Sequence, residues 1–176
     1  MSTPDAAREV VLVEACANRL PIGPLIAHEG DDLLGVVRHA ASRPQTRVVG
    51  VVDAEDRLVG IVPLLRLAEA VIARVAPEWL LAAIIDLEDV ARFGHEVEAR
   101  TVGDVMQEPA FVTPTTPVDV AYRLMRQRQI SGVYVVDDDR RPIGYLDLLE
   151  LAVLDIDTIE REATDSETGT GPERPA

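Results

Sequence analysis

The side chains best suited to catalysis or metal binding are few and scattered. The chain has one cysteine, Cys16, and three histidines, His28, His39 and His95. None of the histidines has the spacing of a His-x-x-x-His zinc motif, and one cysteine cannot form an intrachain disulfide or a multi-cysteine zinc site. All 17 basic residues are arginine, which excludes the lysine of a phosphate-binding loop or of a Schiff base. We therefore predict a protein that is not an enzyme and that holds no catalytic metal.

Two acidic clusters could suggest a calcium or magnesium site. They are residues 53–56, Asp-Ala-Glu-Asp, and residues 137–139, Asp-Asp-Asp. Neither has the spaced ligands of an EF-hand loop, and each separates two β-branched runs where a tight turn is needed. Because aspartate side chains readily bond to backbone amides in turns, we interpret both clusters as turns between strands.

The charge balance limits the classes of partner. Acidic residues number 31 and basic residues 17, which gives a net charge of −14. Such a chain repels phosphate backbones and anionic lipid surfaces, so we expect no nucleic acid partner and no membrane insertion. The first residues lack the basic and apolar regions of a signal peptide. Together with the single cysteine, this predicts a cytoplasmic protein.

An internal repeat organises the chain. Residues 47–70 align without a gap on residues 131–154, and ten of the 24 aligned pairs are identical. Duplication explains this better than chance in an apolar-rich composition. The repeat predicts strands at 48–52 and 58–62 in the first copy, and at 132–136 and 142–146 in the second.

Each copy also has a short extended piece and a helix upstream of these strands. The extended pieces are 25–27 and 110–113, and apolar residues at helical spacing follow each one. Thr116 is expected to cap the second of these helices, with Pro117 as its first residue. The repeated unit is therefore β-α-β-β-α.

A further helix is expected between the copies. It begins near Pro77, carries an apolar stripe that includes Leu87 and Val90, and ends at Gly94. This helix either packs on its own repeats or forms a surface for dimerisation or for a partner, with Trp79 as an anchor.

These features divide the chain into five segments. They are an N-terminal segment (1–19), repeat one (20–76), an inserted helix (77–97), repeat two (98–156) and an acidic tail (157–176). The tail has six acids and two arginines among Thr, Ser, Gly and Pro. Such a composition cannot bury enough apolar surface to order itself, so we predict a disordered tail.

The repeat resembles the tandem CBS (cystathionine β-synthase type) domain family, whose paired arrangement is called a Bateman module. The resemblance is strongest in the second copy, in Phe-Val-Thr-Pro at 111–114, Ile-Ser-Gly-Val at 130–133 and Gly-Tyr-Leu at 144–146. It implies that the two repeats pack through their sheets as a pseudo-twofold pair. The expected fold is therefore α+β, with two β-α-β-β-α repeats and the extra helix that the sequence predicts between them. It also implies a homodimer.

The resemblance implies a regulatory role as well. Family members usually sense adenosine-containing ligands, such as AMP, ATP or S-adenosylmethionine, in clefts between the copies. The family motif implies candidate ligand-binding residues on both copies: Thr46, Arg47, Arg66, Thr113, Ser131, Gly132, Val133, Asp147 and Glu150.

This sequence departs from the family pattern at two positions in each copy. The family usually has a Ser or Thr for phosphate three residues after a strand glycine, and an Asp for ribose three residues later. Here these positions hold Pro63 and Arg66, and Asp147 and Glu150. Asp147 places a negative charge where a phosphate would lie, which favours a nucleoside, a cationic S-adenosyl ligand or a bound metal over a bare nucleotide in copy two.

Beside a catalyst, for which the sequence has no motif, two functions remain open. One is a regulatory module that senses an adenosine-type ligand and signals to a separate protein. The other is a dimerisation or protein-interaction module whose nucleotide sites have degenerated and hold no ligand. The sequence does not identify a target protein.

Overall fold

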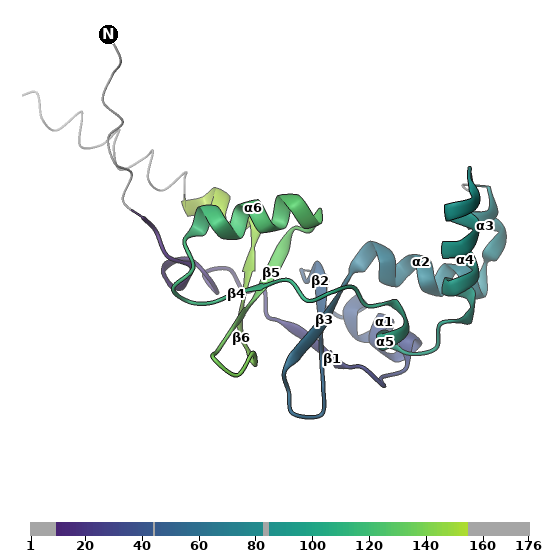
Figure 1. Cartoon of the computed structure of the whole chain (residues 1–176), viewed down its shortest axis with the longest axis horizontal. Coiled ribbons are helices and arrows are strands. Elements are labelled where there is room, and N and C mark those ends of the chain that lie inside the picture. Colours follow the sequence, from purple (N-terminus) through teal and green to yellow (C-terminus); the bar gives the residue numbers. More distant parts are fainter. Residues whose placement is uncertain (1–9, 44, 83–84, 155–176) are drawn as a thin grey trace, which may run out of the picture.

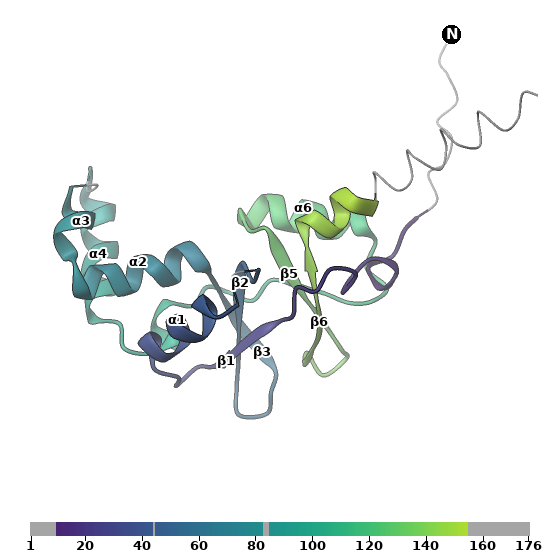
Figure 2. The same ribbon diagram turned by 180° about the vertical axis from the view of Figure 1, so that it is seen from behind.

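Two three-stranded sheets form the centre of the molecule (Figures 1 and 2). The computed structural model describes residues 10–43, 45–82 and 85–154. The predicted disordered tail, 157–176, lies outside the described residues. The limits of the five predicted segments stay predictions.

The two repeats have the same topology, which confirms the predicted β-α-β-β-α unit. Each sheet has its first strand parallel and its third strand antiparallel to the central one. Repeat one contains β1 (Leu25–His28), α1 (Leu33–Ala41), β2 (Val48–Val52), β3 (Leu58–Pro63) and α2 (Leu64–Val75). Repeat two contains β4 (Phe111–Val112), α6 (Val118–Arg128), β5 (Gly132–Val136) and β6 (Pro142–Asp147), and residues 148–154 are helical.

The central strands β2 and β5 are buried along their whole length. Strands covered on both faces are continuous apolar runs, which is the pattern of both segments. The acidic turns that follow are held by aspartate, as predicted. Asp53 Oδ1 accepts from the amides of Glu55 and Arg57, and Asp137 Oδ1 accepts from those of Asp139 and Arg141.

The segment between the repeats is helical, but the prediction of one helix ending at Gly94 is wrong. It forms α3 (Pro77–Leu81) and α4 (Leu87–Glu98). Asp86 starts the second helix, because its side chain accepts from the amide of Asp89. Gly94 lies inside α4. Both helices lie beyond α2, at the end of the molecule away from repeat two (Figures 1 and 2).

The predicted start of α6 also needs correction. Pro117 is the N-cap residue, and no side chain caps this helix. The Thr116 hydroxyl instead accepts from the amide of Thr113 at 2.9 Å. Thr116 therefore stabilises the turn after β4 rather than the helix.

The segment before each repeat packs on the other repeat. The 3-10 helix η1 (Val13–Ala15) bonds to the turn between β4 and α6, since Val13 N donates to Thr116 O and Glu14 N donates to Pro114 O. The helix α5 (Val102–Val105) contributes Val102 and Val105 to the core of repeat one. Asn18 N donates to Tyr145 O, and Tyr145 N donates to the Asn18 side chain; Gln107 and Ile61 exchange two backbone hydrogen bonds. The two crossing segments, residues 10–22 and 99–107, thus tie the repeats together.

The repeats meet at Tyr134 of β5 and Gly50 of β2, which are equivalent positions in the repeat. The Tyr134 hydroxyl accepts from Gly50 N at 2.8 Å, and its proton is within reach of Leu25 O at 2.7 Å and Val48 O at 3.0 Å. A Cβ on residue 50 would lie 2.7 Å from Tyr134 Cζ. Glycine is therefore required at position 50.

We expect Tyr134→Phe to lower the free energy of unfolding by about 1–3 kcal/mol, because it removes the acceptor of the buried Gly50 amide and the one proton that Leu25 O or Val48 O accepts. Urea denaturation followed by circular dichroism measures this. Tyr122→Phe is the matched control, since Tyr122 is 43% exposed. Equal stability of the two variants would contradict a role for the hydroxyl in joining the repeats.

Candidate functional site

The predicted residues of copy two lie together at the end of β6. Asp147 pairs with Gly132 across the β5–β6 ladder, and Leu148 N donates to Ser131 O. Asp147 and Glu150 are each 1% exposed. The structure therefore brings four candidates together: Gly132, Asp147 and Glu150 are buried, and Ser131 is half-buried beside them.

Asp147 begins the helical residues 148–154. Its Oδ1 accepts from Leu149 N at 2.9 Å, as an N-cap residue does. Its Oδ2 is buried and has no hydrogen-bond partner among the described residues. The helix start that would otherwise attract a phosphate is thus already occupied by a carboxylate.

Glu150 uses both carboxylate oxygens on backbone amides. Oε2 accepts from Asp147 N at 3.0 Å, and Oε1 accepts from Leu20 N at 2.9 Å. With Asp147 as N-cap, Glu150 stands at the position of the acid in a capping box. It also holds the N-terminal crossing segment against repeat two.

Tyr145 belongs to this cluster, although the sequence did not single it out as a site residue. Its hydroxyl is buried without a hydrogen bond to a described residue, and a Cβ at Gly132 would overlap it. Burial, reinforced by Tyr134 and Asp147, raises the pKa of Tyr145; Arg47 acts in the opposite direction through a contact that falls short of hydrogen-bond geometry. The cluster therefore holds two unpartnered polar atoms, Tyr145 Oη and Asp147 Oδ2.

In copy one, Arg66 occupies the position equivalent to Glu150, and it also ties down a crossing segment. Its Nε donates to Val105 O at 2.9 Å. Leu64 N donates to Arg47 O, as Leu148 N does to Ser131 O in copy two. Arg66 and Glu150 are opposite in charge, yet each bonds to the backbone of a crossing segment and so has the same structural role.

Glu96 of α4 interacts electrostatically with Arg66. The sequence analysis did not include Glu96 among the candidate site residues. It is 4% exposed, and its Oε1 has no partner among the described residues. Burial, with the nearby Glu69 carboxylate, raises the pKa of Glu96, while Arg66 and Arg92 oppose the rise. A carboxyl with a raised pKa destabilises the fold as the pH rises, because the ionised form is the one that is poorly solvated.

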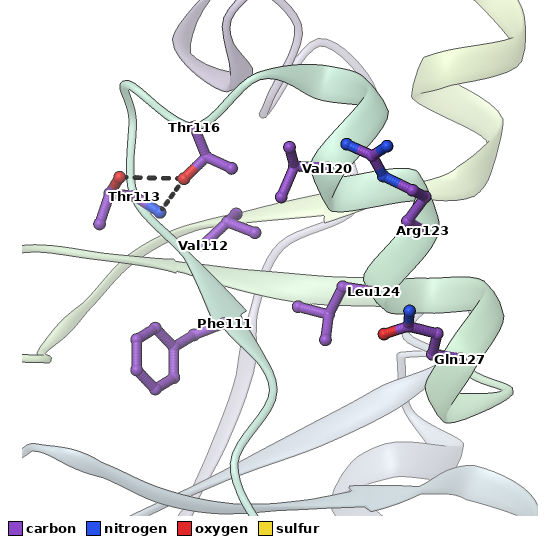
Figure 3. A pocket seen from close by; sticks show the side chains of 8 residues that line it. All are labelled: Phe111, Val112, Thr113, Thr116, Val120, Arg123, Leu124 and Gln127. Carbon is purple, nitrogen blue, oxygen red and sulfur yellow. Dashed lines mark hydrogen bonds between the residues drawn. The ribbon is translucent and has the colours of Figure 1, made fainter.

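The remaining candidates lie in other surroundings. Thr46 is buried, and its hydroxyl donates to Gly23 O at 3.4 Å, whereas Arg47 is exposed. Val133 belongs to the core of repeat two. Thr113 lines a pocket of about 430 Å³ between β4 and α6, with Phe111, Leu124 and Arg123 (Figure 3). No other candidate residue lines that pocket.

Cys16 is not a reactive thiol. It is fully buried, and burial together with the Glu150 carboxylate raises its pKa. A thiol with a raised pKa is protonated at neutral pH and is a poor nucleophile. Across the described residues, no three His, Cys, Asp or Glu side chains gather as a metal ion would require.

Residues 102–154 match the family model for the CBS domain. The chain also matches solved CBS-domain pairs over more than 80% of its length. This chain is folded as a CBS-domain pair. A search of curated proteins gave no match. No helix among the described residues has the length and apolar character to cross a membrane.

Three of the similar structures define the likeness. A CBS domain-containing protein from Thermotoga maritima is 22% identical, with a TM-score of 0.65 over 82% of this chain and 93% of that one. The CBS domain pair of protein MJ0100, in complex with 5′-methylthioadenosine and S-adenosyl-L-methionine, is 22% identical, with a TM-score of 0.58 over 83% and 96%. A CBS domain protein from Pyrobaculum aerophilum, complexed with AMP, is 20% identical, with a TM-score of 0.57 over 80% and 90%.

We expect Glu150→Gln to destabilise this CBS-domain pair by about 1–3 kcal/mol, because one of the two amides then faces an NH₂ group. The amide of Leu20 should also exchange faster with solvent. Urea denaturation and hydrogen exchange measure the two effects. Glu108→Gln is the control, since the Glu108 side chain is 81% exposed. Unchanged protection of Leu20 would show that Glu150 does not hold the crossing segment.

Proposed function

We propose that this CBS-domain pair is a regulatory module that senses a small adenosine-type ligand in the cleft between its repeats and signals to a separate protein. The observation that carries the proposal is the unpartnered, buried Oδ2 of Asp147 beside the equally unpartnered hydroxyl of Tyr145. Buried polar atoms are normally bonded, so a ligand that donates hydrogen bonds there would complete the site. The similar structures that hold AMP, S-adenosyl-L-methionine and 5′-methylthioadenosine support an adenosine-type ligand.

The charge of the site favours one kind of adenosine ligand. Asp147 and Glu150 are both carboxylates, and Asp147 occupies the helix start that would bind phosphate. Like charges repel strongly where water is excluded. A neutral nucleoside or a cationic S-adenosyl ligand therefore suits copy two better than AMP or ATP.

Calorimetric titration tests the proposal directly. The panel is S-adenosylmethionine, 5′-methylthioadenosine, AMP and ATP, with thermal unfolding as a second readout. At 100 times its dissociation constant, a ligand of the folded state stabilises by about 2.7 kcal/mol. We expect the S-adenosyl and methylthioadenosine ligands to bind and AMP to bind more weakly.

Changing Asp147→Thr should reverse this preference. It removes the charge and supplies a hydroxyl, and we expect the affinity for AMP to rise by about tenfold, or about 1.4 kcal/mol. The control is Asp139→Thr in the β5–β6 turn, where the carboxylate is exposed. If the unchanged protein binds AMP tightly and Asp147→Thr binds it no better, Asp147 does not exclude phosphate.

One observation favours the second function, a ligand-free interaction module. Glu150 and Arg66, at the two positions that would bind ribose, already bond to the crossing segments. If none of the four ligands binds, these residues are structural only and the interaction module is the better description. In either case we propose that the protein has no catalytic activity and is cytoplasmic, as its acidic charge and single cysteine suggest.

We also propose a homodimer. Leu65 of α2 and its equivalent Leu149 are 72% and 50% exposed, so each repeat presents an apolar position to solvent. Light scattering after gel filtration should give twice the chain mass of 19.1 kDa. We expect the double variant Leu65→Glu, Leu149→Glu to be monomeric, with Ile143→Glu as an equally exposed control. A mass of one chain for the unchanged protein would contradict the dimer.

A further inference from the structure

Only part of the apolar surface of α4 faces the rest of the chain. Glu96 points inward and is 4% exposed, whereas Leu87 is 86% and Val90 49% exposed. The inner side also holds Phe93 and Val97, which are half-buried. A surface helix normally buries its whole apolar stripe. Here half of that stripe faces solvent while a carboxylate is buried.

The solvent-exposed apolar residues of α4 form a continuous strip along two turns of the helix. We call Leu87, Val90, Ala91 and Gly94 the α4 face. All four are exposed, and a Cβ built on Gly94 would meet no atom within 4 Å. Positions 87, 91 and 94 follow one another along one side of the helix. A large side chain next to two small ones forms a knob beside a hollow, which allows another helix to approach closely.

More apolar surface lies next to this face. Trp79 of α3 is 69% exposed, and Ile85, just before α4, is 91% exposed. Figures 1 and 2 both show α3 and α4 side by side at the end of the molecule. Large aromatic residues exposed beside aliphatic ones are typical of binding surfaces.

The charges around the face are almost all negative. Glu78, Asp86, Glu88 and Glu98 are exposed on α3, α4 and the described residues between them. The single arginine there, Arg92, is paired with Asp89 at 3.1 Å. A second copy docked through the same face would bring two sets of four acids toward each other, and like charges across an interface repel. The acidic rim matches a basic partner instead.

We propose that the α4 face binds an amphipathic helix of another protein whose apolar ridge is flanked by arginine or lysine. Leu87 and Val90 pack against the ridge of the partner, and its backbone approaches over Ala91 and Gly94. The exposed acids pair with its basic flanks. This surface is remote from the Asp147 cluster, and the proposal does not depend on ligand binding.

Trp79 is the only tryptophan of the chain, so its fluorescence reports on this surface. The probes are two 18-residue helical peptides with the same leucine ridge, one with arginine flanks and one with glutamate flanks. We expect the arginine peptide to shift the emission of Trp79 to the blue in a saturable way. Its affinity should be at least tenfold higher than that of the glutamate peptide.

Variants separate the α4 face from the rest of the surface. Leu87→Asp should weaken binding of the arginine peptide at least tenfold, whereas Ile143→Asp, on β6, should leave it unchanged. Circular dichroism confirms that both variants are folded. No shift with the arginine peptide, equal binding of both peptides, or full binding by Leu87→Asp would each overturn the proposal.

A second copy as the occupant would give a different result. The emission of Trp79 would then depend on protein concentration without any peptide, and Leu87→Asp would abolish that dependence. This outcome also overturns the proposal. No adenosine ligand is present in these titrations, so their failure is distinct from a failure of the proposed ligand site.

Discussion

The contact between Tyr134 and Gly50 determines how the two repeats fit together. The two residues occupy the same position in their repeats, and they face each other where the central strands meet. Two tyrosines would collide there and two glycines would leave a void, so the two repeats must have different residues at this position. The duplicated sequence keeps its β-α-β-β-α plan, but one copy supplies the ring and hydroxyl and the other supplies the space. The burial of β2 and β5 on both faces depends on this fit.

The same asymmetry extends to the candidate sites. Arg66 and Glu150 are equivalent in the repeat and opposite in charge, yet each bonds to the backbone of the segment that crosses from the other repeat. A ligand that used either side chain would compete with that bond. Such binding would loosen a crossing segment, which is a direct physical link between a small molecule and the packing of the pair.

Much of the fold could be predicted because it is periodic. The strands at 48–52 and 132–136 are unbroken apolar runs, and Asp53 and Asp137 mark the turns after them. The inserted helix was harder, because Asp86 starts a new helix in a segment whose apolar spacing continues through it. In the site, the Asp-Leu-Leu-Glu sequence at 147–150 has the spacing of a capping box. This local pattern explains why both acids bond to backbone amides at the start of the helix.

Other features of the site are not accessible from the sequence. The bond from Leu20 to Glu150 joins residues 130 positions apart, and no local pattern encodes it. The burial of Tyr145 depends on the absence of a side chain at Gly132, in a neighbouring strand. The inward position of Glu96 depends on how α4 is rotated against α2. Apolar spacing alone predicts that Leu87 and Val90 face inward instead.

The crossing segments also constrain the order in which the molecule can be completed during synthesis. Val102 and Val105 belong to the core of repeat one, so that repeat lacks part of its interior until the chain has passed the inserted helices. Val13 and Cys16 belong to the core of repeat two, so these residues are synthesised well before the repeat on which they pack. Repeat one is therefore not a finished folding unit when its own strands have emerged, whereas repeat two finds its missing core residues already synthesised. Residues 10–22 therefore stay without their packing partners until repeat two has been synthesised.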